Sequence, residues 1–327
     1  RGGMSDVADA RYRQVQALAL AVVARVQSIW SGLSAENILA SLQGDQGAAI
    51  LDAVVAGQLT AAQGAQAFVG QAMAERGAAA RMAAELDPGA LVGVASDGRP
   101  LTSLLYVPAI TTYTTLAAGA DPATALLAGM NQMARMVATQ IADTSRSATQ
   151  VAMVTHRRCI AYVRVVKLPA CGRCIILAGR QYSYSTGFQR HPKCDCGMDP
   201  IDIERWGDVP SPEKLVAQMT PQEQRRRLGA AAVDALDKGA DLAQVVNARR
   251  GMQTMTVHGR KIQATTEGNT VRGIAGKRLT TDAGASKVSG ERYRIAKRPR
   301  LMPEEILRLA DDRDHQLRLL KLHGYIY

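Results

Sequence analysis

Aromatic residues are scarce in this chain, at 4% of 327 residues with two Trp and two Phe. A hydrophobic core must therefore be built from Ala, Leu, Val and Met, which favours packed helices over a β-sandwich or barrel. Long apolar runs are also missing, because the longest run, Ala17 to Ala24, is closed by Arg25 and falls far short of the ~20 residues of a membrane span. No secretory signal pattern is visible at the amino end. These absences predict a soluble helical protein.

Lysine is absent before Lys167, and the net charge of +11 is unevenly distributed. Residues 249–300 hold 13 Lys and Arg against three acidic residues. A basic block on a nearly neutral body predicts a polyanionic partner or environment. The alternative is a solvated basic loop, or a segment buried between subunits. The expected contact residues are Arg249, Arg250, Arg260, Lys261, Arg272, Lys277, Arg278, Lys287, Arg292, Arg294, Lys297, Arg298 and Arg300.

The sequence pattern predicts a mainly α fold with a small zinc-stapled α+β insert. The 47% of apolar and 21% of charged residues are near globular averages, which excludes wholesale disorder. The expected segments are an Ala-rich helical domain, a small sheet with a Cys/His cluster, a helical segment, a basic Gly/Thr-rich extended arm and a C-terminal helix. In that order they cover residues 1–155, 156–205, 206–249, 250–300 and 301–327.

Helix start and stop signals divide the first half. Residues 5–85 read as helices, with Ser34 as a cap and Thr60 opening a further helix. Asp87-Pro88-Gly89 is expected to end this helical run. Asp121-Pro122 starts a long helix that reaches about residue 155, and its Met-rich stripe is interpreted as helix–helix core rather than as a cofactor site.

The pattern changes after this helix. Residues 159–166 are β-branched and alternate in polarity, which predicts a strand, and residues 175–177 and 181–184 are short strand candidates. Helices resume at 212–227 and 229–249, with Ser211-Pro212 as a cap and Thr220 to Glu223 at the spacing of a capping box. Residues 250–300 are expected to be an arm or long loop with short strands, and Pro303 starts the last helix.

Four of the five cysteines and one histidine fall within 26 residues, in the patterns Cys171-x-x-Cys174 and His191-x-x-Cys194-x-Cys196. A C-x-x-C turn presents two thiolates on one side of a loop, where tetrahedral zinc takes both at ~2.3 Å. Five candidates therefore compete for four ligand positions. The metal would hold together a small sheet that lacks a core of its own.

Other uses of these residues fit the sequence less well. Disulfides are unexpected because nothing else indicates a secreted protein, and a redox C-x-x-C would need a thioredoxin-like context. A metal-free packed loop remains an alternative. A zinc deaminase needs H-x-E before P-C-x-x-C, whereas His156 is followed by two Arg and Ala170 separates Pro169 from Cys171. Cys159 lies outside the spacing and is expected to be a buried strand residue.

The cluster resembles a known family. The sequence C-x-x-C-x-x-x-x-G (Cys171, Cys174, Gly179), then Gly187 and H-P-x-C-x-C (191–196), is similar to the phage Mu F family of minor head proteins. The tail resembles related proteins of actinobacterial siphophages, whose genes usually lie beside the portal gene and are often labelled capsid maturation protease. The tail motifs are Asn247-Ala-Arg-Arg-Gly251, Thr265-Thr-Glu-Gly268, Arg272-Gly-Ile-Ala-Gly276 and the final stretch from Pro303 to Tyr327.

The resemblance implies a minor capsid protein inside the virion, near the portal vertex, that leaves with the DNA or stays as a structural part. It implies the portal protein and other capsid proteins as partners and residence in the host cytoplasm during assembly. The basic block is what a protein beside packaged double-stranded DNA would use to contact phosphates without sequence preference. We expect neither a membrane nor a small-molecule substrate.

The protease label raises an enzymatic alternative that acts on coat or scaffold protein. A serine protease needs a nucleophile, a general base and an oxyanion site. No G-x-S-x-G occurs, and the histidines outside the cluster, His156, His258, His315 and His323, show no recognisable spacing to Ser or Asp. We therefore expect no catalytic residues, and we expect His156 to be a hydrogen-bonded structural residue.

Overall fold

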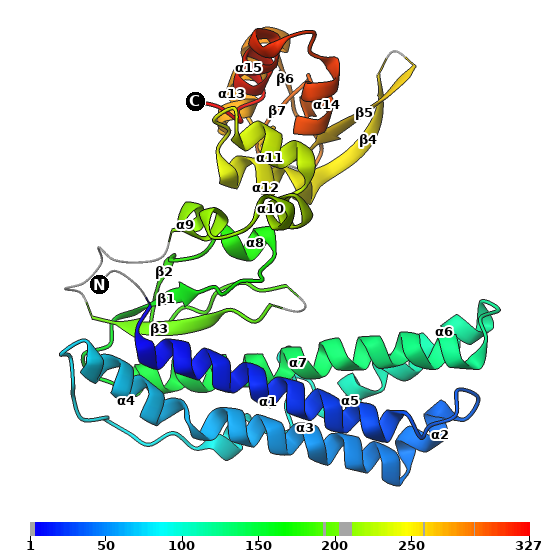
Figure 1. Ribbon diagram of the computed structural model, residues 1–327, viewed down its shortest axis with the longest axis vertical. Coiled ribbons are helices and arrows are strands. Elements are labelled where there is room, and N and C mark those ends of the chain that lie inside the picture. The colour runs from blue at the N-terminus through cyan, green and yellow to red at the C-terminus, as the bar shows by residue number, and fades with distance from the viewer. Residues whose placement is uncertain (1–3, 192–193, 203–210, 258, 291) are drawn as a thin grey trace. The chain divides into compact units, whose positions relative to one another are not determined.

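The computed structural model of the chain describes residues 4–191, 194–202, 211–257, 259–290 and 292–327 (Figure 1). It divides into two compact units. The first unit comprises Arg1–Val166 and Gly179–Pro210, and the second comprises Lys167–Ala178 and Ser211–Tyr327. The fold is mainly helical with small sheets, as predicted. Within the described ranges, no helix is both long enough and apolar enough to cross a membrane.

Three long helices form the body of the first unit, namely α1 (Asp6–Trp30), α3 (Asp45–Gln63) and α7 (Pro122–Thr155) (Figure 1). Their shared core includes Val26, Trp30, Ile50, Met133 and Ile141, all at most 2% exposed. The Met-rich stripe of α7 thus contributes to helix packing. The shorter elements are α2 (Ile38–Gln43), α4 (Ala65–Glu75), η1 (Pro88–Leu91), α5 (Leu101–Leu105) and α6 (Val107–Ala117).

Close helix approach depends on small residues. A Cβ at Gly57 in α3 would lie 2.7 Å from both Val22 and Ile141 side-chain atoms, so only glycine lets α1, α3 and α7 meet there. This tight packing is why a core with few aromatics suffices.

Some helix boundaries follow the sequence signals and others do not. The Asp121 carboxylate accepts from Thr124 N, and α7 runs from Pro122 to Thr155 as predicted. The predicted Ser34 cap is wrong, because its hydroxyl bonds to Glu36 and Asn37 precedes α2. The predicted start at Thr60 is also wrong: Thr60 lies inside α3, where its hydroxyl donates to Ala56 O at 2.9 Å and is satisfied without a helix end.

The helical run also ends earlier than 87–89. Helix α4 stops at Glu75, and Gly77 takes a φ of +74°, the left-handed conformation that commonly terminates a helix. The carboxylate of Asp87 instead caps the short η1.

A three-stranded antiparallel sheet of the order β2-β1-β3 completes the first unit. Strand β1 (Ala161–Val165) is the central strand and is buried at every position, and β2 (Gln181–Ser183) confirms the predicted strand at 181–184. The strand predicted at 175–177 is wrong, because α8 (Gly172–Ile175) and a turn occupy it. Strand β3 (Gly197–Ile201) was not predicted, since its Gly and Pro are unfavourable in strands and fit only its edge position.

The second unit combines short helices with small sheets. Besides α8, its helices up to residue 248 are α9 (Pro212–Ala217), α10 (Pro221–Leu228), α11 (Ala230–Leu236) and α12 (Leu242–Ala248). Ser211 caps α9, and Thr220 with Glu223 forms the predicted capping box of α10.

The predicted basic arm is more folded than an extended chain. After η3 (Arg249–Gly251) it forms a hairpin of β4 (Met252–Val257) and β5 (Arg260–Thr265), then α13 (Ile274–Ala283), whose Leu279 is fully buried. Its short strands, which were expected, are β6 (Ala285–Ser286), β7 (Ile295–Ala296) and β8 (Arg300–Leu301). The sheets are β4-β5-β8 and β6-β7.

The C-terminal helix is divided into α14 (Pro303–Leu309) and α15 (Arg313–Leu322). Asp312 caps α15 through its bond from His315 N. Leu322 of α15 packs on Ala275 and Leu279 of α13, so the arm is ordered by apolar contacts from the distant chain end. Sequence periodicity within the arm does not reveal such contacts.

Candidate metal centre and basic surface

The Cys171-x-x-Cys174 motif forms a tight turn at the start of α8. Cys171 is the N-cap residue, and the amide of Cys174 donates to Cys171 O at 3.0 Å. A Cβ at Gly172 would lie 3.3 Å from Leu228 and 3.5 Å from Val246. The turn is therefore seated closely on α10 and α12.

The second half of the motif forms another turn. The amide of Cys194 donates to His191 O at 3.0 Å, and Cys194 and Cys196 are each 1% exposed. Residues 192–193, between His191 and Cys194, lie outside the described part. None of the five cysteines, all of which are described, forms a disulfide.

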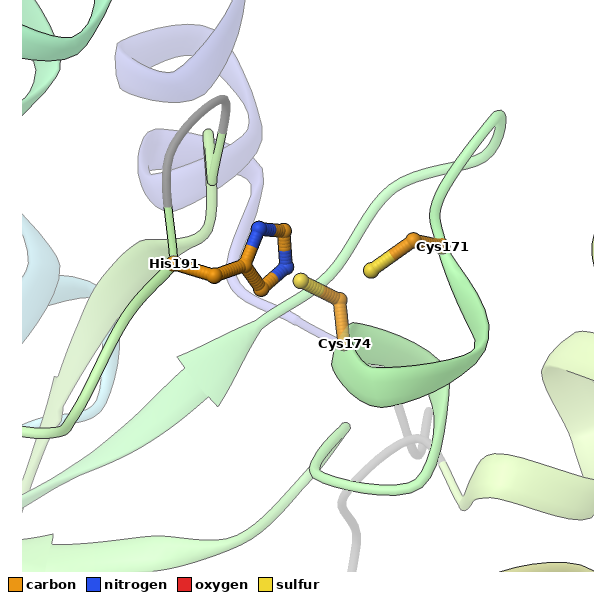
Figure 2. A group of neighbouring side chains, drawn as sticks. All are labelled: Cys171, Cys174 and His191. Atoms are coloured by element: carbon orange, nitrogen blue, oxygen red, sulfur yellow. The ribbon is translucent and has the colours of Figure 1, made fainter. Parts of the chain in front are cut away.

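The five predicted ligands form two overlapping triads. The donor atoms of Cys171, Cys174 and His191 lie within 4.8 Å of one another, and so do the sulfurs of Cys174, Cys194 and Cys196. Figure 2 shows the first triad, with the two sulfurs and the imidazole ring close together. Tetrahedral ligands at ~2.3 Å from zinc stand about 3.8 Å apart, so this spacing and the thiolate–imidazole chemistry fit a zinc-type ion.

Arg164 in β1 lies against the second triad, and it was not predicted from the sequence as part of the site. It is 2% exposed, and its Nη2 lies 3.5 Å from both the Cys194 and the Cys196 sulfur. Its guanidinium stacks 4.2 Å from the centroid of the Phe188 ring. Burial acts to lower the pKa of Arg164, but the charges of Cys196 and Cys194 outweigh it and the pKa is raised. The sequence signal for Arg164 was its position as a single arginine among the apolar residues of the predicted strand.

Arg146 in α7 fixes the backbone of the same loop. Its Nη1 donates to Cys196 O at 2.7 Å and to Cys194 O at 3.3 Å. Arg146 also pairs with Asp143, which accepts a second ion pair from Arg190 at 2.5 Å. The backbone that carries the two sulfurs is therefore held in place by buried, charge-assisted hydrogen bonds.

Cys159 lies apart from the triads. It is 4% exposed, its thiol is 3.5 Å from Ala161 O, and burial raises its pKa to about 12. It precedes β1 rather than lying within it. A neutral, enclosed thiol of this kind is a packing residue.

The histidines outside the cluster show no catalytic pairing among the described residues. His156 ends α7 and is 1% exposed, but neither ring nitrogen bonds to a described residue, so the expected hydrogen-bonded role is wrong. Burial lowers the pKa of His156. His323 is fully buried and accepts from Leu301 N at 3.1 Å, while His315 faces Asp311 at 3.5 Å. His258 lies outside the described residues.

The thirteen predicted DNA-contacting residues divide into three groups: one is buried, eight are engaged within the second unit, and four are exposed without such engagement. Arg300 is 1% exposed and donates to His323 O and Glu267 O, so it is a structural residue and cannot reach a phosphate. Its side chain satisfies carbonyls that no backbone partner reaches in the described part of the chain.

Other basic side chains of the set are also engaged within the second unit. Arg249, Arg250 and Arg298 form ion pairs with acidic residues, and Arg292 stacks on Tyr293. The remaining engaged members donate to a Tyr hydroxyl or to backbone carbonyls, namely Arg272, Arg278, Lys287 and Arg294.

Four exposed cations of the set make no side-chain hydrogen bond, ion pair or ring contact within the described part of the chain. They are Arg260 and Lys261 at the start of β5, Lys277 in α13 and Lys297 after β7. The sequence alone does not separate these four from the nine that the fold uses or covers.

Comparison with known proteins assigns the chain to a family. No curated protein matches the chain, and no solved structure matches it. A family model described as VG15 protein matches residues 4–221, which include α1 to α7, the three strands of the first unit and all five metal-ligand candidates. The match covers more than half of the chain, so the chain belongs to the VG15 protein family, a family of viral and phage proteins.

Proposed function

We propose that this protein is a minor capsid protein of a phage head, with a structural rather than an enzymatic role. The family match across the first unit carries the proposal, and the resemblance of the Cys/His cluster to Mu F-like minor head proteins supports it. We place it inside the capsid near the portal vertex, in contact with the portal protein and other capsid proteins.

Mass spectrometry of purified virions tests this role. The chain should be found in mature particles at low copy number, and in emptied particles its amount reports whether it leaves with the genome. Absence from mature particles would contradict a resident structural part and favour a transient processing factor.

The second part of the proposal is a structural zinc ion. Four of Cys171, Cys174, His191, Cys194 and Cys196 would hold it, with Cys174 common to both triads. When bound, the ion would supply a cross-link between the turn at Cys171 and the turn at Cys194. Elemental analysis should find about one zinc per chain, and a content below about 0.3 would contradict tight binding.

The third part is contact with packaged double-stranded DNA without sequence preference. The free exposed cations of the second unit support it, because Lys and Arg displace condensed counterions from phosphates. Binding should weaken steeply between roughly 50 and 200 mM salt, and flat binding across that range would be evidence against it.

A capsid maturation protease is the alternative function. It requires a nucleophile within hydrogen-bond reach of a base, and the described contacts of His156, His315 and His323 include no Ser, Thr or Cys side chain. Replacement of His156 by alanine with coat-protein cleavage as the readout would revive this alternative if cleavage stopped.

A further inference from the structure

We infer that the β4–β5 hairpin is the element that contacts DNA, and that it enters the major groove as a two-stranded ribbon. This inference rests on the proposed DNA contact and names the surface responsible. Figure 1 shows the hairpin as a ribbon that extends beyond the helices of the second unit.

The outer half of the hairpin lacks a core of its own. In this half, Thr256 of β4 and Arg260 and Lys261 of β5 are exposed and Met255 and Ile262 are half-buried. Ala264 and Thr265 at the base of β5 are buried where they pair with β8. A two-stranded hairpin is marginally stable by itself. The exposed side chains of Thr256, Arg260 and Lys261 make no hydrogen bond or ion pair with the described residues, so they are available to a partner.

The charge of the hairpin indicates which kind of partner it contacts. Residues 252–265 contain Arg260 and Lys261 and no acidic residue. These two are adjacent, exposed and free of described side-chain contacts, whereas most other basic residues of 249–300 are held by acids, carbonyls or rings of their own unit. A pair of free cations on an acid-free ribbon is complementary to phosphates rather than to an apolar or basic partner.

The width of the hairpin indicates which groove of DNA it enters. Neighbouring strands lie ~4.8 Å apart, and a two-stranded ribbon with its side chains fits the major groove, which is ~12 Å wide, rather than the minor groove of ~6 Å. Cross-strand pairing places Thr256 opposite Lys261 and Met255 opposite Ile262. The polar and cationic residues Thr256, Arg260 and Lys261 therefore lie nearer the turn than the half-buried apolar pair of Met255 and Ile262.

The test measures binding of the full chain to a labelled mixed-sequence duplex of about 30 base pairs by fluorescence anisotropy, over a series of salt concentrations. The test variant is Arg260→Gln with Lys261→Gln. The matched control is Lys277→Gln with Lys297→Gln, which removes the same charge from exposed, uncontacted positions outside the hairpin. Circular dichroism melting checks that both variants fold.

The hairpin variant should bind about tenfold or more weakly at 100 mM salt. Its slope of log K against log salt should fall by about two, because each phosphate that the protein no longer neutralises lowers the slope by ~0.9. The control should change the slope by less than one. The major-groove ligand methyl green should displace the protein and the minor-groove ligand distamycin should not; the reverse would overturn the groove assignment.

Other outcomes distinguish failure of the hairpin assignment from failure of the proposed DNA contact. Equal losses in both variants, with wild-type binding intact, would overturn the hairpin but leave DNA contact standing. No binding by the wild-type chain would overturn DNA contact itself. If the hairpin variant bound DNA normally but failed to enter particles, the ribbon would be a docking edge for a capsid protein, and the inference would be wrong.

Discussion

The Nη2 atom of Arg164 lies 3.5 Å from the sulfur of Cys196, although 32 residues separate them in the sequence. Antiparallel pairing of β1 with β3 places Arg164 opposite Met198, and the chain entering β3 brings Cys196 beside the guanidinium. A buried cation against two cysteine sulfurs would balance the charge of a zinc–thiolate centre, since zinc with three thiolates and one imidazole has a net charge of −1.

The first prediction follows from this contact. Arg164→Gln should weaken zinc binding by about tenfold or more, the usual effect of removing a partner of metal ligands. Competition with a chromogenic chelator measures the affinity. Arg157→Gln, at an exposed position, is the matched control and should bind zinc like the wild type. Equal affinities for all three proteins would show that Arg164 only packs against Phe188.

The second prediction concerns the residue that both triads share. Cys174→Ser should abolish stoichiometric zinc and lower the melting temperature, whereas Cys159→Ser should keep its zinc because Cys159 lies outside both triads. Chelation of the wild-type protein should lower its melting temperature in the same direction. Full zinc occupancy in Cys174→Ser would rule out this ligand assignment.

The third prediction is a pH dependence from His323. Burial lowers its pKa to about 3, with the charges of Arg298 and Arg300 acting in the same direction. Its unfolded value is near 6.5, so the unfolded state binds a proton as the pH falls below 6.5 while the folded state does not. The stabilisation is present above pH 6.5 and is lost progressively toward pH 3.

Urea unfolding at pH 7 and pH 5 measures this loss, which should be about 2 kcal/mol for His323. His323→Gln keeps an acceptor for Leu301 N but does not titrate, so its loss over this range should be smaller by about that amount. Because burial also lowers the pKa of His156, the wild-type loss contains both contributions and only the difference between proteins reports His323. Identical losses in both proteins would contradict the prediction.

The fourth prediction compares two helical glycines. Gly57→Ala should destabilise the first unit by about 1–3 kcal/mol, because its methyl would lie 2.7 Å from Val22 and Ile141 atoms. Gly70→Ala in α4 should be stabilising by about 0.5–1 kcal/mol, since its methyl meets only the end of Met82 at 3.5 Å and alanine favours the helix. Thermal melting of both variants checks the opposite signs, and a shared sign would contradict the packing argument.

Features that depend on neighbouring residues were predictable. At the caps of Asp121 and Thr220, the side-chain oxygen accepts a hydrogen bond from the backbone amide three residues on. The C-x-x-C turn closes within four residues. The start of α14 at Pro303 belongs to the same class. In each case, the residues that make the structure also stand together in the sequence.

Features that depend on distant partners were missed or mistaken. Strand β3 contains Gly197 and Pro200 and is a strand only because β1 pairs with it. The segment 250–300 is ordered by Leu322 of α15, which packs on α13. Arg300 is buried and donates to the carbonyl of His323, which lies outside that segment. Local propensity carries no information on such contacts.

By itself, the sequence determined the helical class, the caps at Asp121, Ser211 and Thr220, the identities of the soft metal donors and the excess of positive charge, because these follow from composition and from short spacings. Tertiary structure decided which donors share a triad, that Arg164 stands beside them, and which cations remain exposed once the others are paired or buried. Those outcomes arise from packing between segments far apart in the chain, where burial and charge pairing are settled only when the chain has folded.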